Sequence, residues 1–333
     1  MAELYPLKFE ARLKERIWGG NALVNCYHKK ADPSGKYGES WELSAVSDNV
    51  SVVSNGFLSG NNLEELIEVY MGDITGDRVY DKFGNEFPLL IKLIESTDNL
   101  SIQVHPDDEL AKKRHNAYGK TEMWYILESG KNARIYTGFK EHVDKKTYTD
   151  ALSEGTLEKI LNTEIPSAGD VFFTPAGRIH AIGPGITLVE IQQTSDITYR
   201  IYDWNRVGTD GKPREMHTDL ALDAIDFKAS GKTGFRSDPI LNKTKNLVNC
   251  EYFTTNIITF NEAMEKDYSL LDSFVIYICT EGEFLIRWEG NSEPVMKGEI
   301  VLLPAMIKEV TLEPQNEATV LEVVINENTS QNK

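Results

Sequence analysis

The sequence predicts a mainly β fold made of two similar β-barrels with short helical insertions. Two groups of residues recur at matched spacings: Gly169-Asp-Val-x-x-x-Pro175-Ala176 returns as Gly298-Glu-Ile-x-x-x-Pro304-Ala305, and Tyr125-Ile-x-x-x-Gly130 returns as Tyr277-Ile-x-x-x-Gly282. In both halves, short runs of strand-forming residues are separated by turns that contain Gly or Pro. Because an internal repeat means that one structural unit occurs twice, we expect the same β-barrel in each half.

The chain has 333 residues, enough for two domains that each bury a core. Between Asp226 and Asn246 it is rich in Lys, Ser, Gly and Pro and has little periodicity, which is typical of a linker or a long loop. We therefore expect a first domain over residues 1–235, which carries the helical insertions, and a second over residues 236–326. A disordered polar tail is expected over residues 327–333.

The first ninety residues predict short strands followed by one helix and a buried strand. The strands are expected over Leu7 to Leu13, Glu39 to Ser44 and Val50 to Val53. From Asn62 to Tyr70, apolar residues follow an Asn cap at helical spacing. The apolar run from Pro88 to Ile94 has strand length and carries one lysine, Lys92, which must emerge at a sheet edge or point into a polar cavity.

The stretch from Leu100 to Leu127 organises the rest of the chain. Gln103 and His105 are two residues apart in a segment of β character, so their side chains lie on one face of the sheet. Pro106 ends that strand, and Asp107-Asp108 start a short helix that runs to Tyr118. The chain returns in a strand from Thr121 to Leu127 that opens with Glu122, which makes Glu122 a third candidate ligand beside Gln103 and His105.

Further strands and two helical regions follow. A Gly-Asp turn at Gly169 leads into a strand, a Pro-Ala-Gly turn follows, and His180 opens the next strand. The other expected strands are Ala133 to Gly138, Thr187 to Gln192 and a series from Tyr252 to Ile325, and the expected helices are one or two within Thr147 to Leu161 and one over Met216 to Ile225.

The charge of the chain limits its partners. Acidic residues number 52 and basic residues 35, for a formal net charge of -17, which argues against nucleic acid and anionic membranes as partners. A small anionic substrate would need a local basic pocket. The sequence shows neither a signal peptide nor a membrane-spanning run, so we expect a cytoplasmic protein. Three widely spaced cysteines, Cys26, Cys250 and Cys279, predict free thiols rather than disulfides or a structural zinc cluster.

The pattern Gly-x5-Pro-x-Gly-x2-His, from Gly169 to His180, resembles the second motif of the cupin superfamily, whose fold is a jelly-roll β-barrel. Gln103, His105, Glu122 and Gly130 resemble its first motif, with Gln in the first place and a helical insertion before the Glu. The four donors are then Gln103, His105, Glu122 and His180. Two imidazoles with a carboxylate and an amide suit one Zn²⁺ or a similar divalent ion.

Several segments resemble the type I mannose-6-phosphate isomerases, in their short bacterial form. They are Phe87-Pro-Leu-Leu-Ile-Lys92, Ser101-Ile-Gln-Val-His-Pro-Asp-Asp108, Gly119-Lys-Thr-Glu122 and Ser195-Asp196-x-x-x-Arg200. The resemblance implies a zinc-dependent aldose-ketose isomerase that interconverts mannose 6-phosphate and fructose 6-phosphate. Some members have His-Lys before the metal-binding Glu, whereas Gly119 precedes the lysine here, so a base at that position is absent.

The resemblance also places Lys92, Lys120 and Arg200 at the cavity. Isomerisation removes a proton from C2, stabilises an enediol and returns the proton at C1. We expect Arg200 and Lys120 to hold the phosphate or the developing charge, and Asp196 to orient Arg200. The proton carrier is either Lys92, if burial lowers its pKa, or a group at the metal such as bound water.

The second copy of the repeat lacks these donors, because Glu122 aligns with Phe274, His180 aligns with Glu309 and no Gln-x-His precedes them. We therefore expect the second barrel to be metal-free. Two other functions are the alternatives: a non-catalytic sugar-binding cupin, which would have lost the basic residues, and an iron-dependent cupin dioxygenase, whose ligands are richer in His. The length and the absence of a Gly-rich nucleotide loop exclude a fused nucleotide transferase. We expect a monomer or a weak homo-oligomer.

Overall fold

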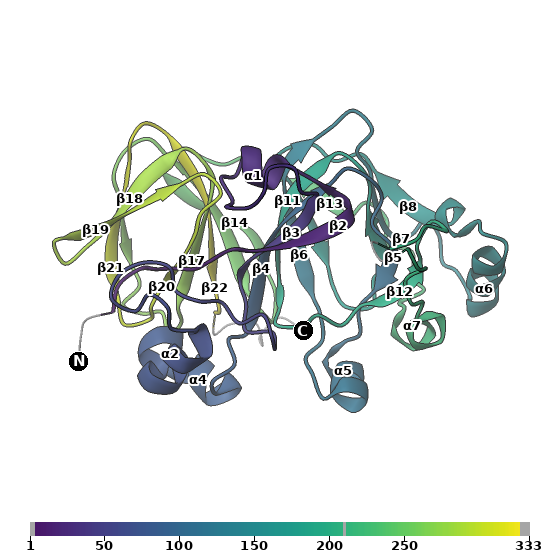
Figure 1. Cartoon of the computed structure of the whole chain (residues 1–333), viewed down its shortest axis with the longest axis horizontal. Helices are drawn as coiled ribbons and strands as arrows, with labels where there is room; N and C mark the ends of the chain where they lie inside the picture. The colour runs from purple at the N-terminus through teal and green to yellow at the C-terminus, as the bar shows by residue number, and fades with distance from the viewer. Residues whose placement is uncertain (1–3, 209–210, 327–333) are drawn as a thin grey trace. The chain divides into compact units, whose positions relative to one another are not determined.

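The structure is a computed structural model that describes residues 4–208 and 211–326, and it divides into two compact units. The first unit comprises Leu13–Trp41 and Leu90–Ser237, and the second comprises Met1–Arg12, Glu42–Leu89 and Asp238–Lys333. Figure 1 shows that each unit is built mainly from β-strands. No helix in the described ranges is long and apolar enough to cross a membrane.

The first unit contains a seven-stranded and a five-stranded sheet. The larger has the order β13-β9-β6-β11-β4-β3-β2 and the smaller the order β12-β5-β10-β7-β8. The strands are β2 (Arg12–Gly20), β3 (Tyr37–Leu43), β4 (Leu89–Ser96), β5 (Ile102–Val104), β6 (Glu122–Ser129), β7 (Ile135–Phe139), β8 (Leu161–Glu164), β9 (Asp170–Thr174), β10 (His180–Ile182), β11 (Ile186–Gln193), β12 (Tyr199–Tyr202) and β13 (Gly234–Arg236). The helices are α1 (Ala22–Asn25), α5 (Asp108–His115), α6 (Lys145–Ser153), the 3₁₀ helix η1 (Leu157–Lys159) and α7 (Thr218–Ala224).

The second unit contains a six-stranded sheet, β1-β20-β17-β22-β15-β14, and a four-stranded sheet, β16-β21-β18-β19. Its strands are β1 (Leu7–Lys8), β14 (Lys243–Asn249), β15 (Thr254–Phe260), β16 (Met264–Asp267), β17 (Val275–Glu281), β18 (Glu283–Trp288), β19 (Asn291–Met296), β20 (Ile300–Leu303), β21 (Glu309–Pro314) and β22 (Ala318–Val324). Its helices are α2 (Leu63–Tyr70), α3 (Gly72–Thr75) and α4 (Asp77–Phe83).

The strand order confirms the internal repeat. In one sheet of the first unit β9, β6, β11 and β4 are neighbours in that order, and in the second unit β20, β17, β22 and β15 take the matching places. The other sheets match in the same way, with β5-β10-β7-β8 corresponding to β16-β21-β18-β19. Both units are therefore jelly rolls of the predicted mainly β class, although their two sheets are not joined into closed barrels.

Local sequence signals placed most elements correctly. Helix α2 follows Asn62, whose side chain accepts a hydrogen bond from the Glu65 amide while Glu65 reciprocates, forming a capping box. Helix α5 begins after Asp107, whose carboxylate accepts from the Leu110 amide. The region expected to be a linker, Asp226 to Asn246, contains β13 and the start of β14 instead, because these short strands complete sheet edges that a local pattern does not reveal.

The compact units differ from the expected domains of residues 1–235 and 236–326, because Met1–Arg12 and Glu42–Leu89 belong with the C-terminal segment. Strand β1 pairs with β20. The Asp272 carboxylate accepts from the Asp77 and Arg78 amides at 2.8 and 3.0 Å and so caps helix α4. These contacts join segments nearly 200 residues apart in the chain. The predicted polar tail, residues 327–333, lies outside the described residues.

Hydrophobic cores in each unit hold the sheets in place. In the first unit, one core includes Trp18, Trp124 and Ile186, and another includes Tyr148 and Tyr199. In the second unit, the core contains Phe260, Tyr277 and Phe284, each almost fully buried.

One glycine shows how tightly the second unit is packed around α4. Gly76 has φ +91°, and a Cβ there would lie 2.6 Å from the Asp272 carbonyl oxygen, a backbone atom that cannot move aside cheaply. Gly60 has φ +92° with open space around it. We expect Gly60→Ala to lower the free energy of unfolding by about 1 kcal/mol from backbone strain alone. Gly76→Ala should cost a further ~1–3 kcal/mol through the clash. Urea unfolding of both variants tests this, and equal losses would contradict it.

Candidate metal centre and cavity

Three of the four predicted ligands form a buried cluster in the first unit. Potential ligand atoms of His105, Glu122 and His180 all lie within 4.8 Å of one another. Each of the three residues is almost fully buried. His180 opens β10 and pairs in register with Gln103 on β5, Glu122 opens β6, and His105 follows β5 directly. The two-residue spacing of Gln103 and His105 therefore does point both donors toward the same place.

Hydrogen bonds to backbone carbonyls orient both imidazoles. His105 Nδ1 lies 2.9 Å from the Ile197 carbonyl oxygen, and His180 Nδ1 lies 2.8 Å from that of Arg178. Since a carbonyl oxygen only accepts, each Nδ1 carries the proton, and each Nε2 presents a lone pair toward Glu122. The Nε2 atoms are 3.6 and 3.3 Å from the Glu122 oxygens. A carbonyl partner of this kind fixes the tautomer that binds metals.

Burial keeps both histidines in the neutral form. It lowers the pKa of His180 to about 4. The pKa of His105 falls well below its usual value, first through burial and then through the nearby positive charge of Lys120. Neutral imidazoles are the form that coordinates a metal ion, so the electrostatics of the cluster suit that role.

The donor set fits a divalent cation. Glu122 Oε1 is buried, and no group in the described part of the chain donates a hydrogen bond to it, which is costly for a carboxylate unless a cation satisfies it. Two imidazole nitrogens and one carboxylate supply three ligands, which leaves positions for Gln103 and for water or substrate. Gln103 adjoins the cluster, since its Nε2 lies 3.2 Å from His180 Nε2, while its Oε1 accepts a long hydrogen bond of 3.4 Å from Ser101 Oγ. The fourth predicted ligand is thus beside the other three.

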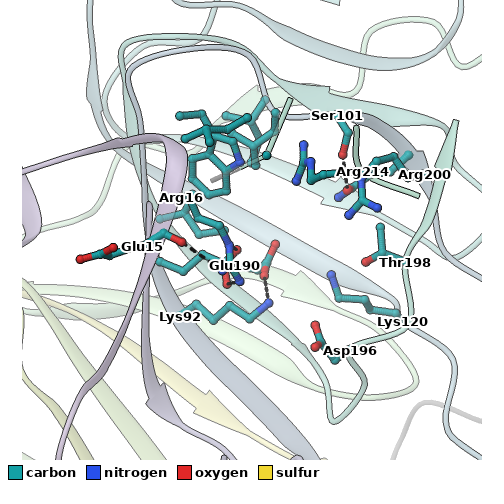
Figure 2. A pocket seen from close by; sticks show the side chains of 18 of the residues that line it. Glu15, Arg16, Lys92, Ser101, Lys120, Glu190, Asp196, Thr198, Arg200 and Arg214 are labelled. Atoms are coloured by element: carbon teal, nitrogen blue, oxygen red, sulfur yellow. Dashed lines mark hydrogen bonds and ion pairs between the residues drawn. The ribbon is translucent and has the colours of Figure 1, made fainter. Parts of the chain in front are cut away.

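A cavity of about 460 Å³ lies next to the cluster, entirely within the first unit. Figure 2 shows its charged lining. The four predicted catalytic residues all line it, namely Lys92, Lys120, Asp196 and Arg200. The candidate ligand Gln103 lines it as well. Further charged or polar lining residues that the sequence did not single out are Glu15, Arg16, Glu39, Ser101, Glu190, Thr198, Arg214 and His217.

Lys92 points into this cavity and forms a buried ion pair there. Its Nζ donates to Glu190 Oε2 at 3.0 Å (Figure 2) and to Gln192 Oε1 at 2.9 Å. Trp124 Nε1 donates to the other Glu190 oxygen at 3.2 Å. Burial raises the pKa of Glu190, but the charges of Lys92 and Lys120 and these hydrogen bonds outweigh it and lower the pKa to about 2. Glu190 is therefore an anion that holds Lys92.

Lys120 lies between the cavity and the cluster of candidate metal ligands. Its Nζ donates to Glu122 Oε2 at 2.9 Å and lies 3.3 Å from His105 Nε2. Burial lowers the pKa of Lys120, but the carboxylates of Glu122, Glu190 and Asp196 outweigh it, so the pKa is raised overall. The side chain is therefore a fixed positive charge beside the candidate ligands.

The expected contact between Asp196 and Arg200 is not formed among the residues that the structure describes. The Arg200 guanidinium donates instead to the Glu215 carbonyl oxygen at 2.9 Å. Asp196 is exposed on the cavity wall, where its charge acts on Lys120. The reason is positional: Arg200 lies on β12 while Asp196 precedes that strand and projects toward a different part of the cavity (Figure 2).

Sequence reasoning missed Glu190, whose signal was available. Glu190 interrupts the apolar part of strand β11, which is buried along its whole length, and an acidic residue in a buried strand indicates a buried partner. Arg16 and Arg214 offered less, because both belong to segments rich in charged residues where most side chains face solvent. Only the fold brings them to the cavity wall.

Two family models match the chain. The model of the phosphomannose isomerase type I catalytic domain matches residues 6–136, and that of the mannose-6-phosphate isomerase cupin domain matches residues 243–323. The first match includes Gln103, His105 and Glu122, and the second lies wholly in the C-terminal repeat.

Individual proteins match over nearly the whole chain. Mannose-6-phosphate isomerase ManA of Bacillus subtilis (strain 168) is 35% identical over 323 residues, which are 95% of this chain and 98% of that protein. Mannose-6-phosphate isomerase of Streptococcus mutans is 33% identical over 92% of this chain and 94% of its own length. The crystal structure of mannose 6-phosphate isomerase from Bacillus subtilis superimposes with a TM-score of 0.85 at 31% identity, covering 96% of this chain and 99% of that one.

Proposed function

We propose that the cavity beside His105, Glu122 and His180 is the active site of this chain, which belongs to the type I phosphomannose isomerase family. The chain is an aldose-ketose isomerase that interconverts D-mannose 6-phosphate and D-fructose 6-phosphate. The observation that carries this assignment is the meeting of two features in one unit: a buried donor cluster suited to a cation, and a polar cavity with paired lysines next to it.

Gln103, His105, Glu122 and His180 would hold one Zn²⁺. Neutral imidazoles and a carboxylate are typical zinc ligands, and the amide oxygen of Gln103 would complete the set. The Glu122 oxygen, which has no hydrogen-bond donor among the described residues, supports an ion at this place. When bound, the ion would supply Lewis acidity toward the substrate oxygens at C1 and C2. Gln103 would have to turn its amide so that the oxygen, rather than the nitrogen, faces the cluster.

Lys92 and Lys120 stabilise the enediol. Both ammonium groups are held by buried carboxylates, at 3.0 Å from Glu190 and 2.9 Å from Glu122, so they stay fixed while charge develops on the substrate oxygens. An ammonium held this way has no lone pair with which to accept a proton. The alternative that Lys92 carries the proton is therefore disfavoured by its ion pair.

Asp196 suits the role of proton carrier better than the predicted role of orienting Arg200. It lines the cavity near Lys120, and among the described residues it makes no hydrogen bond or ion pair, so its oxygens are free to accept a proton from C2 and return it at C1. A proton shuttled by one group between adjacent carbons is consistent with an enediol intermediate. Glu190 is less suited, because its low pKa makes it a weak base.

The two alternative functions fit less well. A non-catalytic sugar-binding cupin predicts a degraded basic lining, whereas Lys92, Lys120 and Arg200 all face the cavity. An iron-dependent dioxygenase is expected to have more histidine ligands than the two of this cluster. We also propose that the enzyme acts in the cytoplasm as a monomer or weak homo-oligomer, on a sugar phosphate and without nucleic acid or membrane partners, in keeping with its net charge of -17.

Chelation followed by metal restoration tests the proposal. Mannose 6-phosphate isomerisation is followed as fructose 6-phosphate formation in the purified protein, then after removal of metal by a chelator, then after addition of zinc, cobalt or ferrous iron. We expect activity to fall to background and to return best with zinc. Full activity in protein shown by mass spectrometry to be metal-free would contradict the metal role. Oxygen uptake with ferrous iron would instead support the dioxygenase.

A further inference from the structure

We infer that Gln192 is a positioning residue that fixes the proposed proton carrier, Asp196, relative to Lys92. The inference rests on the proposed function, since it takes Lys92 to stabilise the enediol and Asp196 to carry the proton. Gln192 is not among the residues that line the cavity, so it acts through the groups that it holds. The sequence did not single it out, because an amide near the end of a strand gives no local signal of its partners.

The hydrogen bonds of Gln192 fix the orientation of its amide group. The side chain is fully buried. Its Oε1 accepts from Lys92 Nζ at 2.9 Å, and its Nε2 donates to the carbonyl oxygens of Gln193 and Ser195 at 2.9 and 2.7 Å. Because carbonyl oxygens only accept and an ammonium only donates, the amide cannot be turned over without losing all three bonds. One buried group therefore joins Lys92 to the backbone that follows β11.

The first end of this link is shared with Glu190. Glu190 and Gln192 are two residues apart on β11, so their side chains leave the same face of the strand. Lys92 Nζ donates to both, at 3.0 and 2.9 Å. Glu190 supplies the charge that keeps Lys92 protonated, whereas Gln192 supplies a neutral acceptor that is bonded onward to the next segment.

The second end of the link is the turn that carries Asp196. Residues 194–198 form neither helix nor strand, so no ladder of backbone hydrogen bonds holds them. Side chains hold the turn instead: Gln192 binds the Ser195 carbonyl oxygen, and Ser195 Oγ donates to the Tyr118 carbonyl oxygen at 2.9 Å. Asp196 comes next in the chain and faces the cavity (Figure 2). A displacement of about 1 Å in a reacting group can slow catalysis by about 100-fold, so the hold on this turn matters for proton transfer.

Gln192→Met with Asn162→Leu as its matched control tests the inference. Each change replaces an amide by an apolar group of similar shape, and Asn162, on β8 in the same unit, donates to the Gly231 carbonyl oxygen at 2.8 Å without lining the cavity. Kinetics with mannose 6-phosphate are measured at saturating zinc, with metal content checked by mass spectrometry. For Gln192→Met we expect kcat to fall about 10–100-fold while KM changes by less than about threefold. Asn162→Leu should change neither by more than about twofold.

A kinetic cycle with Asp196→Asn shows whether Gln192 acts through Asp196. Asp196→Asn removes the proposed proton carrier, so adding Gln192→Met should lower kcat by less than about twofold further, since no carrier remains to be positioned. A full second fall in the double variant would mean that Gln192 acts elsewhere and would overturn the inference. An unchanged kcat in Gln192→Met alone would overturn it as well.

Hydrogen exchange measures the hold on the turn without relying on turnover. Peptides that cover residues 194–198 should exchange their amide hydrogens faster in Gln192→Met than in the wild type or in Asn162→Leu. Equal exchange in all three proteins would overturn the inference. If the wild type does not isomerise mannose 6-phosphate but exchange rises in Gln192→Met alone, the proposed function is refuted and the link from Gln192 to the turn stands.

Discussion

Glu122→Gln is expected to lower turnover of mannose 6-phosphate by roughly 10³-fold and to remove most of the bound metal, because a neutral amide replaces the one carboxylate of the cluster. The change is nearly isosteric, so packing around the almost fully buried side chain is preserved. The variant also leaves Lys120 without its closest anion, which lies 2.9 Å away in the native protein. Metal content by mass spectrometry and steady-state kinetics, both at saturating zinc, measure the two effects separately.

Glu128→Gln is the matched control. It alters a carboxylate on the same strand, β6, which accepts a hydrogen bond from Tyr27 at 3.0 Å and is not among the candidate metal ligands or the residues that line the cavity. It should leave metal content and kcat within about twofold of the wild type, since surface changes of this kind are worth only a few tenths of a kcal/mol. Retention of stoichiometric zinc together with near-normal turnover in Glu122→Gln would show that the cluster is not the metal centre.

Breaking the ion pair between Lys92 and Glu190 should have the second largest effect. Both side chains are about 95% buried, so Glu190→Gln or Lys92→Met alone leaves one charge without its partner in a low-dielectric site. We expect each single variant to lose about 3 kcal/mol or more of unfolding free energy. Turnover should fall by roughly 10²–10³-fold, because the ammonium that faces the enediol is lost or mispositioned. Glu190→Gln keeps an acceptor for Trp124, which limits other damage.

The double variant Lys92→Met with Glu190→Gln separates stability from catalysis. With neither charge present, the destabilisation should be smaller than the sum of the single losses, as is usual when a buried pair is removed together. Turnover should nevertheless stay at the level of Lys92→Met. Urea denaturation and kinetics on all four proteins complete the cycle. Additive stability losses would mean that the two residues do not interact, and recovery of turnover in the double variant would rule out a catalytic role for Lys92.

Much of the fold followed from local sequence signals. Helices α2 and α5 each begin after a side chain that caps them, Asn62 and Asp107, and such signals act within one turn of the chain. The repeated Gly-Asp-Val and Gly-Glu-Ile motifs correctly indicated two copies of one unit, because they mark the same strand, β9 and β20. Strands β13 and β14 went unrecognised, since what makes them strands is pairing with distant partners.

The candidate site likewise has contacts that the local sequence predicted correctly and one that it did not. Gln103 and His105 could be placed together because a strand alternates its side chains with a period of two, and Glu122 opens the strand that follows. The contact proposed between Asp196 and Arg200, only four residues apart, is absent from the part of the chain that the structure describes. A short separation in the sequence does not fix the direction in which a side chain points where a turn precedes a strand. Whether Asp196 and Arg200 are in contact could therefore be decided only from the structure.

Local motifs identified the candidate donors of this protein: two imidazoles, a carboxylate and an amide on adjoining strands, with lysines nearby. The pairing of the charges became apparent only in the folded chain. Glu190 meets Lys92 across 98 residues of chain, Asp203 accepts hydrogen bonds from Arg214, and Arg200 donates to the Glu215 carbonyl oxygen rather than to Asp196. The reason is that donor types and spacings are local properties, whereas the charge balance of a cavity is a sum over segments that only folding brings together.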